Sequence, residues 1–216
     1  MSTIARPLAK GPVHYPESDG LPMADNTRQF HWIVTIKGGL DAVFKDEPNV
    51  FVAGNLLWYP VEGSNTIRTA PDVLVVFGRP KGHRGSYLQW LEGNIAPQVA
   101  FEILSPGNRA GALINKFAFY EKYGVEEYYI YDPDSGDLSG WLRDKGSLKP
   151  IAEMKGWVSP RLGVRFDLAG QELCLYGPDG KKFASYVELV EQREDAERRA
   201  ERLAAKLRAM GVDPEA

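Results

Sequence analysis

Two acidic residues attract attention because each lies in or beside an apolar, strand-like run. Asp72 follows Pro71 and opens the run 73–76, whereas Glu102 lies inside the run 99–104. An unpaired charge there would cost several kcal/mol of desolvation, so each carboxylate needs a partner. If the two strands are neighbours, the carboxylates converge on an oxygen-rich site. Such a site suits a hard cation, Mg²⁺ or Mn²⁺.

A metal held in this way could bind a phosphate, neutralise developing charge and lower the pKa of a bound water. A nearby lysine would stabilise the transition state or orient that water. Lys116 is the candidate, because the helix expected after the Glu102 strand would let it reach back, whereas Lys122 points to another face. The alternative for Asp72 is a turn or cap, and most helix lysines are solvated.

The elements that must position these residues follow from the apolar pattern. Runs rich in β-branched and aromatic residues predict strands, and the 98–104 run has the continuous apolar character of a central strand. A helix capped by Asn108 and ended by Gly124 separates two of them, which predicts a βαβ unit. The predicted strands are 50–61, 67–77, 98–104 and 127–131, and the helix is 108–123.

The rest of the chain divides into an arm, one domain and a tail. Residues 1–24 are rich in proline and glycine, which predicts a flexible arm. A helix should begin near Asp25, with Gly38–Gly39 as a weak point that could break it in two. Residues 25–186 should form one α/β (α+β) domain with a mixed sheet flanked by helices.

The segment 187–216 predicts a highly charged C-terminal helix. Its apolar residues follow the 4,3 spacing of a short coiled coil, although Arg193 interrupts the stripe. Two alternatives stay open: a solvated helix packed on the domain, or a helix that pairs two copies into a homodimer. The stripe consists of Ala196, Ala200, Leu203, Leu207 and Met210.

Composition limits the class of protein. The 216 residues are 44% hydrophobic and 25% charged, with a formal net charge of -3, as in ordinary globular proteins. A single cysteine, Cys174, excludes an internal disulfide and a cysteine-based zinc site. No signal peptide or membrane-spanning run is present in the sequence, so we expect a cytoplasmic protein that does not enter a membrane.

Three strings of the sequence carry a family resemblance. They are TAPDVLVV around Asp72, FEILSPGN around Glu102, and KFAFYEKYGVEEYYIYDP from Lys116 onward. Over residues 25–186 the chain resembles the Uma-two family of restriction endonucleases, common in cyanobacteria, in the PD-(D/E)XK nuclease superfamily.

The resemblance implies a restriction-endonuclease-like fold and divalent-metal-dependent cleavage of DNA. It makes Asp72 and Glu102 the metal-binding acidic residues, with Mg²⁺ or Mn²⁺ as cofactor. Leu104 departs from the superfamily pattern, because it stands where a lysine is usual. Lys116 matches the helix lysine that looks like the substitute in relatives. The first helix, where relatives often supply another acidic residue, offers Asp25 and Gln29.

A second set of residues could bind nucleic acid. The connection 78–97 interleaves basic and aromatic side chains, as contact with a DNA backbone and an unstacked base would need. Two further polar residues follow Glu102 and could bind a phosphate at a helix N-terminus, or cap that helix. The candidates are Arg79, Lys81, Arg84, Ser105 and Asn108.

Three functions remain open on sequence alone. The first is a metal-dependent DNA endonuclease that uses Asp72, Glu102 and Lys116. The second is a nuclease-like fold that no longer cuts and serves as a DNA-binding or protein-interaction module. The third is a β-rich ligand domain, such as a sugar-binding domain, indicated only by the tryptophans Trp58, Trp141 and Trp157.

Overall fold

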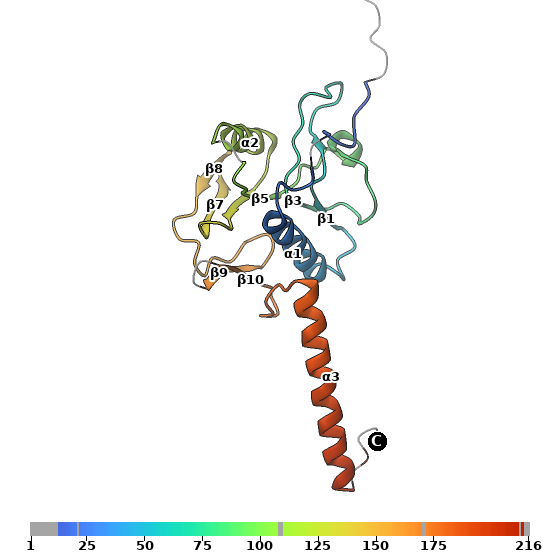
Figure 1. Ribbon diagram of the computed structural model, residues 1–216. Coiled ribbons are helices and arrows are strands. Elements are labelled where there is room, and N and C mark those ends of the chain that lie inside the picture. The colour runs from blue at the N-terminus through green and yellow to red at the C-terminus, as the bar shows by residue number, and fades with distance from the viewer. Residues whose placement is uncertain (1–12, 21, 108–109, 170–171, 212, 214–216) are drawn as a thin grey trace, which may run out of the picture.

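The protein is a mixed α/β structure with a long C-terminal helix, seen in the computed structural model of Figure 1. Asn108 lies outside the described part, so its predicted capping and phosphate-binding roles are not described. The structure describes residues 13–20, 22–107, 110–169, 172–211 and 213.

A six-stranded mixed sheet forms the centre of the domain. Its strand order is β1-β3-β5-β6-β7-β8, with β5 and β6 parallel and every other neighbouring pair antiparallel. Strand β5, helix α2 and strand β6 form the predicted βαβ unit. The strands are β1 (Val50–Gly54), β3 (Val73–Phe77), β5 (Val99–Ile103), β6 (Glu127–Asp132), β7 (Asp137–Asp144) and β8 (Ser147–Pro150).

The first two predicted strands are shorter than the apolar pattern indicated. Strand β1 stops at Gly54 because Asn55 takes a left-handed backbone conformation, with φ of 48°, which turns the chain. The remainder forms β2 (Trp58–Tyr59), which pairs in parallel with β4 (Tyr87–Leu88), and 3-10 helix η1 (Gln89–Glu92) follows.

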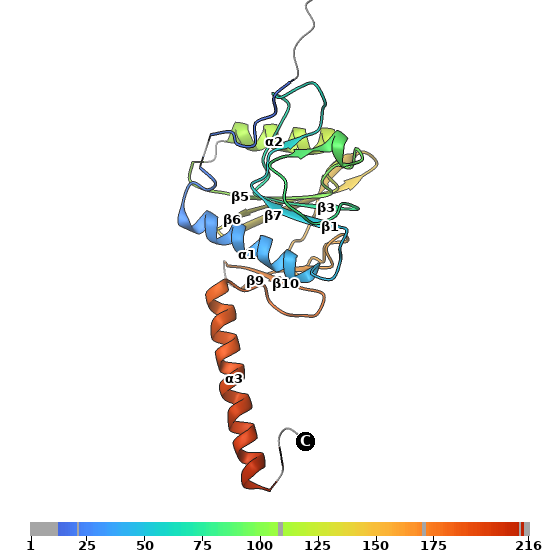
Figure 2. The ribbon, with the colours of Figure 1, turned by 90° about the vertical axis from the view of Figure 1, so that its right-hand side faces the viewer.

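Helices cover both faces of the sheet, which confirms the predicted class. Figures 1 and 2 show α1 (Thr27–Val43) on one face and α2 (Ala110–Tyr123) on the other. Helix α1 begins after Asn26, whose side chain accepts a hydrogen bond from the Gln29 amide. It runs unbroken through Gly38–Gly39, so the broken pair left open by the sequence does not occur.

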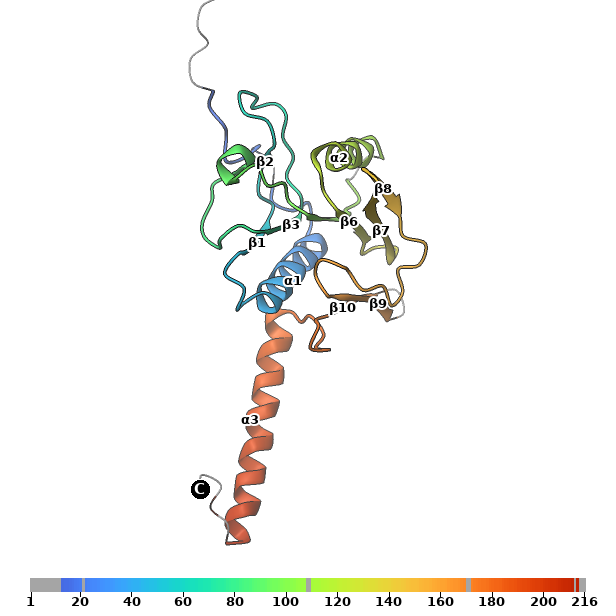
Figure 3. The ribbon, with the colours of Figure 1, turned by 180° about the vertical axis from the view of Figure 1, so that it is seen from behind.

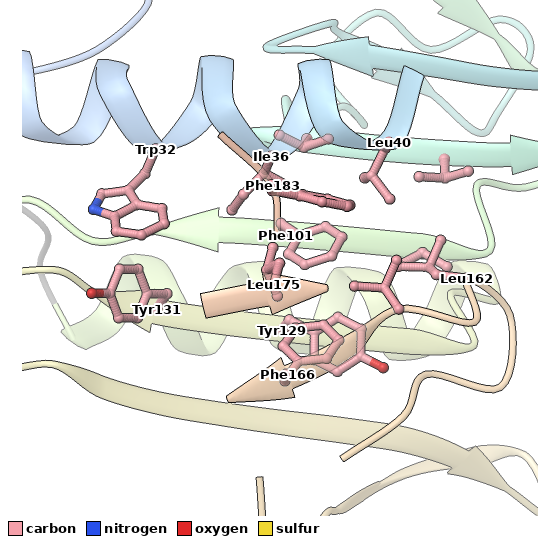
Figure 4. Packing of buried hydrophobic residues seen from close by; sticks show 14 of the residues in the cluster. Trp32, Ile36, Leu40, Phe101, Tyr129, Tyr131, Leu162, Phe166, Leu175 and Phe183 are labelled. Carbon is pink, nitrogen blue, oxygen red and sulfur yellow. The ribbon is translucent and has the colours of Figure 1, made fainter. Parts of the chain in front are cut away.

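The core on the α1 face is closed by a small hairpin. Strands β9 (Arg165–Ala169) and β10 (Glu172–Tyr176) pair with each other and pack below α1. Figure 4 shows the rings and aliphatic side chains that fill this layer. They include Trp32, Ile36, Leu40, Phe101, Tyr129, Phe166, Leu175 and Phe183.

The core on the α2 face is mainly aromatic. Trp58 and Tyr120 are fully buried and stack at an interplanar angle of 3°. Tyr128 and the partly buried Trp141 stack beside them. Trp58 and Trp141 thus belong to this core and the partly buried Trp157 packs against the other, so none offers the sugar-binding surface considered above.

The C-terminal helix stands away from the domain. Helix α3 (Tyr186–Ala209) contains no buried residue, and Figure 3 shows it projecting from its first turn onward. A Ser185–Glu188 capping box starts it. The prediction of a helix here is confirmed, but the alternative that it packs on the domain is wrong.

The described part of the N-terminal arm is held on the domain surface. It contains no helix or strand before Thr27 among residues 13–20 and 22–26. The Tyr15 ring lies 4.9 Å from Trp90 and 5.3 Å from Tyr59, centroid to centroid. The Tyr59 hydroxyl donates to the Pro16 carbonyl at 2.7 Å. These contacts fix the arm beside β2 and η1.

Across the described residues, none of the helices is both long enough and apolar enough to span a membrane.

The two glycines of α1 offer a matched test of this packing. A Cβ on Gly38 would meet nothing within 4 Å, whereas a Cβ on Gly39 would lie 2.1 Å from Cδ2 of the buried Phe183 ring. We expect Gly38→Ala to raise the free energy of unfolding by about 0.5–1 kcal/mol, because alanine favours helix. Gly39→Ala should lower it by about 1–3 kcal/mol, because the ring must move. Urea unfolding measures both, and equal effects would contradict the packing described.

Candidate active site

Strand pairing brings Asp72 and Glu102 together. Strands β3 and β5 are antiparallel neighbours with Val73 opposite Phe101, so the next pair in this register is Asp72 and Glu102. Because side chains alternate along a strand, both carboxylates share a face with the α2-side core residues Leu74 and Ala100. Their side chains are buried, with residue exposures of 7% and 3%.

Helix α2 supplies partners for both oxygens of Glu102. Lys116 Nζ donates to Oε2 at 2.7 Å, and the Tyr120 hydroxyl donates to Oε1 at 2.5 Å. The two donors are four residues apart and therefore lie on one face of the helix. Lys116 also donates to the Ala70 carbonyl at 3.2 Å, which ties α2 to the approach to β3. Glu102 is thus held in a single orientation.

Asp72 is less well compensated. Its Oδ2 accepts a hydrogen bond from the Ile103 amide at 2.7 Å. Burial raises the pKa of Asp72 to about 7, and the nearby Glu102 charge adds to this, while Lys116, the Ile103 amide and Gln29 oppose it. Among the described residues, one ammonium group therefore serves two buried carboxylates, and a second cation would favour ionisation of Asp72.

Lys116 keeps its charge in this setting. Burial by itself lowers the pKa of Lys116, but the charges of Glu102 and Asp72 outweigh that effect, so the net pKa lies above its usual value. For Tyr120, burial and then the Glu102 charge raise the pKa well above the usual range. Lys116 is therefore a cation and Tyr120 a neutral donor near neutral pH.

A cavity of about 300 Å³ opens beside the Asp72 carboxylate. Glu102 does not line the cavity. Its ion-pair partner Lys116 does. The Arg68 guanidinium belongs to the same lining and donates to the Tyr59 hydroxyl at 3.1 Å. The lining combines the N-terminal arm, the β1–β3 connection and α2, and includes Asp19, Asp25, Asn55, Arg68, Asp72 and Lys116.

The start of α1 borders this cavity with polar groups. Gln29 is buried, and its Nε2 donates to the Ile103 carbonyl at 2.8 Å while its Oε1 accepts from the Asp25 amide at 2.7 Å. The Ser105 hydroxyl donates to Asp25 Oδ2 at 2.5 Å. Gln29 thus links the first turn of α1 to the end of β5 and contacts Asp72.

The two carboxylates form a donor set that suits one metal ion. Across the residues that the structure describes, no group of three or more histidine, cysteine, aspartate or glutamate side chains is arranged to hold a metal. Mg²⁺, however, is usually bound by one or two carboxylates, with water and substrate phosphates completing its shell. Asp72 and Glu102 fit that pattern, and the raised pKa of Asp72 shows an unmet need for positive charge.

The basic residues of the 78–97 connection lie away from this cavity. They follow the far end of β3, whose five residues at about 3.3 Å each separate them from Asp72. Arg79 and Arg84 bind Glu92 at 2.8 and 2.6 Å, and Lys81 Nζ donates to the Lys45 carbonyl at 3.1 Å. These contacts give the three residues a role in holding the connection, and their part in DNA binding stays a prediction.

Sequence reasoning missed two members of the site. Tyr120 reads as one more apolar residue of the α2 stripe, since the sequence does not show that its hydroxyl meets Glu102. Arg68 belongs to a loop without a motif. Its only sequence signal is its position four residues before Asp72. Ser105 binds Asp25, which lines the cavity, and its part in binding a phosphate stays a prediction.

The buried aspartate makes metal-free stability depend on pH. Because the pKa of Asp72 is about 7 in the folded chain against 3.8 unfolded, the folded state binds the proton more tightly. The free energy of unfolding should therefore fall as pH rises from about 4 to about 7, by a few kcal/mol, and level off above. Urea unfolding in chelator, taken as the difference between wild type and Asp72→Asn, isolates this dependence. A pH-independent difference would refute it.

Comparison with known proteins places the chain. A search of curated proteins finds no match. Among solved structures, the chain is similar to “a putative nuclease belonging to DUF820 from Anabaena variabilis ATCC 29413”, with 17% identity, a TM-score of 0.47, and coverage of 62% of this chain and 72% of that chain. Residues 24–171 match the family model Uma2, described as “Putative restriction endonuclease”. Since the match spans more than half of the 216 residues, the protein belongs to the Uma2 family.

Proposed function

We propose that the protein is a divalent-metal-dependent endonuclease that hydrolyses DNA phosphodiester bonds, and that it acts in the cytoplasm. The observation that carries this proposal is that Asp72 and Lys116 line one cavity while Lys116 also binds the buried Glu102. Membership of a family described as restriction endonucleases supports the same activity. The N-terminal arm and the β1–β3 connection leave the cavity open to a phosphate from outside.

Asp72 and Glu102 would hold the metal, Mg²⁺ or Mn²⁺. The bound ion would supply charge neutralisation at the phosphate and a water of lowered pKa. The protein's part is to present both carboxylates from adjacent rigid strands and to fix Glu102 through Tyr120 and Lys116. Each Glu102 oxygen already accepts one hydrogen bond, so a metal held there would share its lone pairs with the donor, Lys116 or Tyr120.

Lys116 serves as a positive charge and not as a general base. A base must give up its proton near neutral pH, and the pKa of Lys116 is raised, with Glu102 and Asp72 overcoming the opposite effect of burial. Its ammonium would stabilise the negative charge that develops on the scissile phosphate. Lys116 on α2 would thus take the role that the superfamily pattern gives to a strand lysine at the position of Leu104.

Arg68 would provide a second cationic contact. Arg68 lines the cavity with Lys116, and its guanidinium donates a hydrogen bond to the Tyr59 hydroxyl. A planar guanidinium is well suited to bind phosphate oxygens through two parallel hydrogen bonds. Together with the metal, these cations would compensate the charge that DNA brings into a cavity lined by Asp19, Asp25 and Asp72.

The activity can be tested on supercoiled plasmid and single-stranded DNA. We expect wild-type protein with Mg²⁺ or Mn²⁺ to nick plasmid, and chelator to stop it. Asp72→Ala and Lys116→Ala should abolish nicking, because they remove a metal ligand and the charge at the phosphate. Lys122→Ala is the matched control and should retain activity, because Lys122 is exposed on another part of α2 and contacts the Tyr123 ring.

A fold that binds without cutting would give a different result. No cleavage of either DNA with either metal, and no heat of Mg²⁺ or Mn²⁺ binding that depends on Asp72, would refute the endonuclease. DNA binding that persists in that case would favour the binding module. Cleavage that Lys116→Ala leaves intact would refute the role of Lys116 alone.

Tyr120→Phe tests how Glu102 is held. The change keeps the buried ring against Trp58 but removes the hydroxyl that donates to Glu102. We expect kcat to fall by about 10- to 100-fold and the Mg²⁺ concentration for half-maximal activity to rise, with KM for DNA little changed.

Tyr123→Phe makes the same chemical change one turn further along α2 and should leave both parameters unaltered. A Tyr120→Phe enzyme with unchanged metal dependence would mean that the hydroxyl serves only the packing of the domain.

A further inference from the structure

Helix α3 has an apolar stripe with no partner in the described chain. Tyr186 is 79% exposed, Leu203 56% and Met210 76%, although all three lie on one side of the heptad repeat. An isolated helix of this kind gains nothing from packing, and helices in water depend on packing for most of their stability. The stripe therefore points to a helical partner.

The stripe spans the entire helix when Tyr186, Leu189 and Arg193 are added to the five residues from Ala196 to Met210. Its members are separated by alternating intervals of three and four residues, and seven of the eight are apolar, the exception being Arg193. At about 1.5 Å per residue, the 24 residues of α3 give a seam of about 36 Å. The members are Tyr186, Leu189, Arg193, Ala196, Ala200, Leu203, Leu207 and Met210.

Charge divides the helix into two opposite halves. Residues 186–197 hold five acidic side chains and one basic, whereas residues 198–209 hold one acidic and five basic, so the halves carry -4 and +4. This distribution suits the dipole of a single helix. It also makes α3 complementary to a second α3 that runs in the opposite direction, and repulsive to one that runs in the same direction.

Side-chain size agrees with the antiparallel arrangement. When the two copies overlap over their full length, Ala196 faces Ala200 at the centre and Leu189 faces Leu207 toward the ends. Arg193 then faces Leu203, so that its aliphatic stem can cover the leucine while its head reaches Glu197, which it contacts at 3.4 Å within the helix. A parallel pair would instead set Arg193 against Arg193 of the second copy.

We propose that α3 pairs with α3 of a second copy of this chain in an antiparallel, full-length coiled coil. The assembly is a homodimer with the two domains at opposite ends of the rod. It stands independently of the proposed activity, because nothing in the pairing involves the cavity beside Asp72. Short seams are weak, so the dimer should dissociate on dilution.

Sedimentation velocity of the full chain tests the pairing. In a dilution series, we expect the measured mass at high concentration to approach twice that of one chain, which is 24.0 kDa. Leu203→Glu should return the protein to the monomer mass, because it places a charge in the seam. Ala205→Glu, on the outer side of α3, should leave the dimer intact. A monomer at every concentration, or a dimer that survives Leu203→Glu, would overturn the proposal.

Cysteine cross-linking tests the direction of the helices. We expect Leu189→Cys mixed with a larger, tagged Leu207→Cys protein to give a mixed disulfide dimer under mild oxidation. Each variant alone should remain uncross-linked, since the native Cys174 is buried. Efficient cross-linking of each variant to itself, without the mixed product, would mean a parallel pair and would overturn the antiparallel arrangement. Circular dichroism confirms that every variant remains folded.

Discussion

The structure depends on the cost of burying two carboxylates side by side. Asp72 and Glu102 face each other from adjacent strands, and among the described residues Lys116 is the cation that forms an ion pair with Glu102. Burial, and after it the nearby Glu102 charge, raise the pKa of Asp72 to about 7. A purely structural core would be more stable with apolar residues here. The buried acidic pair, with Lys116 as its cationic partner, is therefore the observation on which the proposed metal site depends.

The two faces of the sheet differ in what they contain: an apolar core lies on the α1 face, and an aromatic core with the two carboxylates lies on the α2 face. On the α1 face, the β9–β10 hairpin and Phe183 close an apolar core around Phe101. On the α2 face, an aromatic core ends at Tyr120, and the carboxylates follow at the edge of the same layer. Because strand residues alternate between the faces, a single strand can serve both. The rigid apolar layer on one face holds the reactive groups on the other in position.

Helix α2 replaces a feature that β5 lacks. Leu104 follows Glu102 by two residues and shares its strand parity, so a lysine there could reach the same site. Lys116 reaches it instead from one turn before Tyr120, and the hydroxyl of that tyrosine completes the hold on Glu102. Strand β5 and helix α2 thus form one structural unit around Glu102, while α3 stands away from it. Removal of α3 should therefore leave the contacts around Glu102 intact.

The sequence by itself indicated the central strands, the helices that flank them and the C-terminal helix, and it identified Asp72, Glu102 and Lys116 as groups that would meet if the two strands were neighbours. These inferences depend on local periodicity and on the rule that a buried charge needs a partner. Both can be applied to the sequence without a structure. Tertiary structure decided that Tyr120 binds Glu102, that Gly39 admits Phe183, and that α3 leaves the domain. Those outcomes depend on which surfaces of separate elements meet in three dimensions. The spacing of residues within one element carries no information about such contacts.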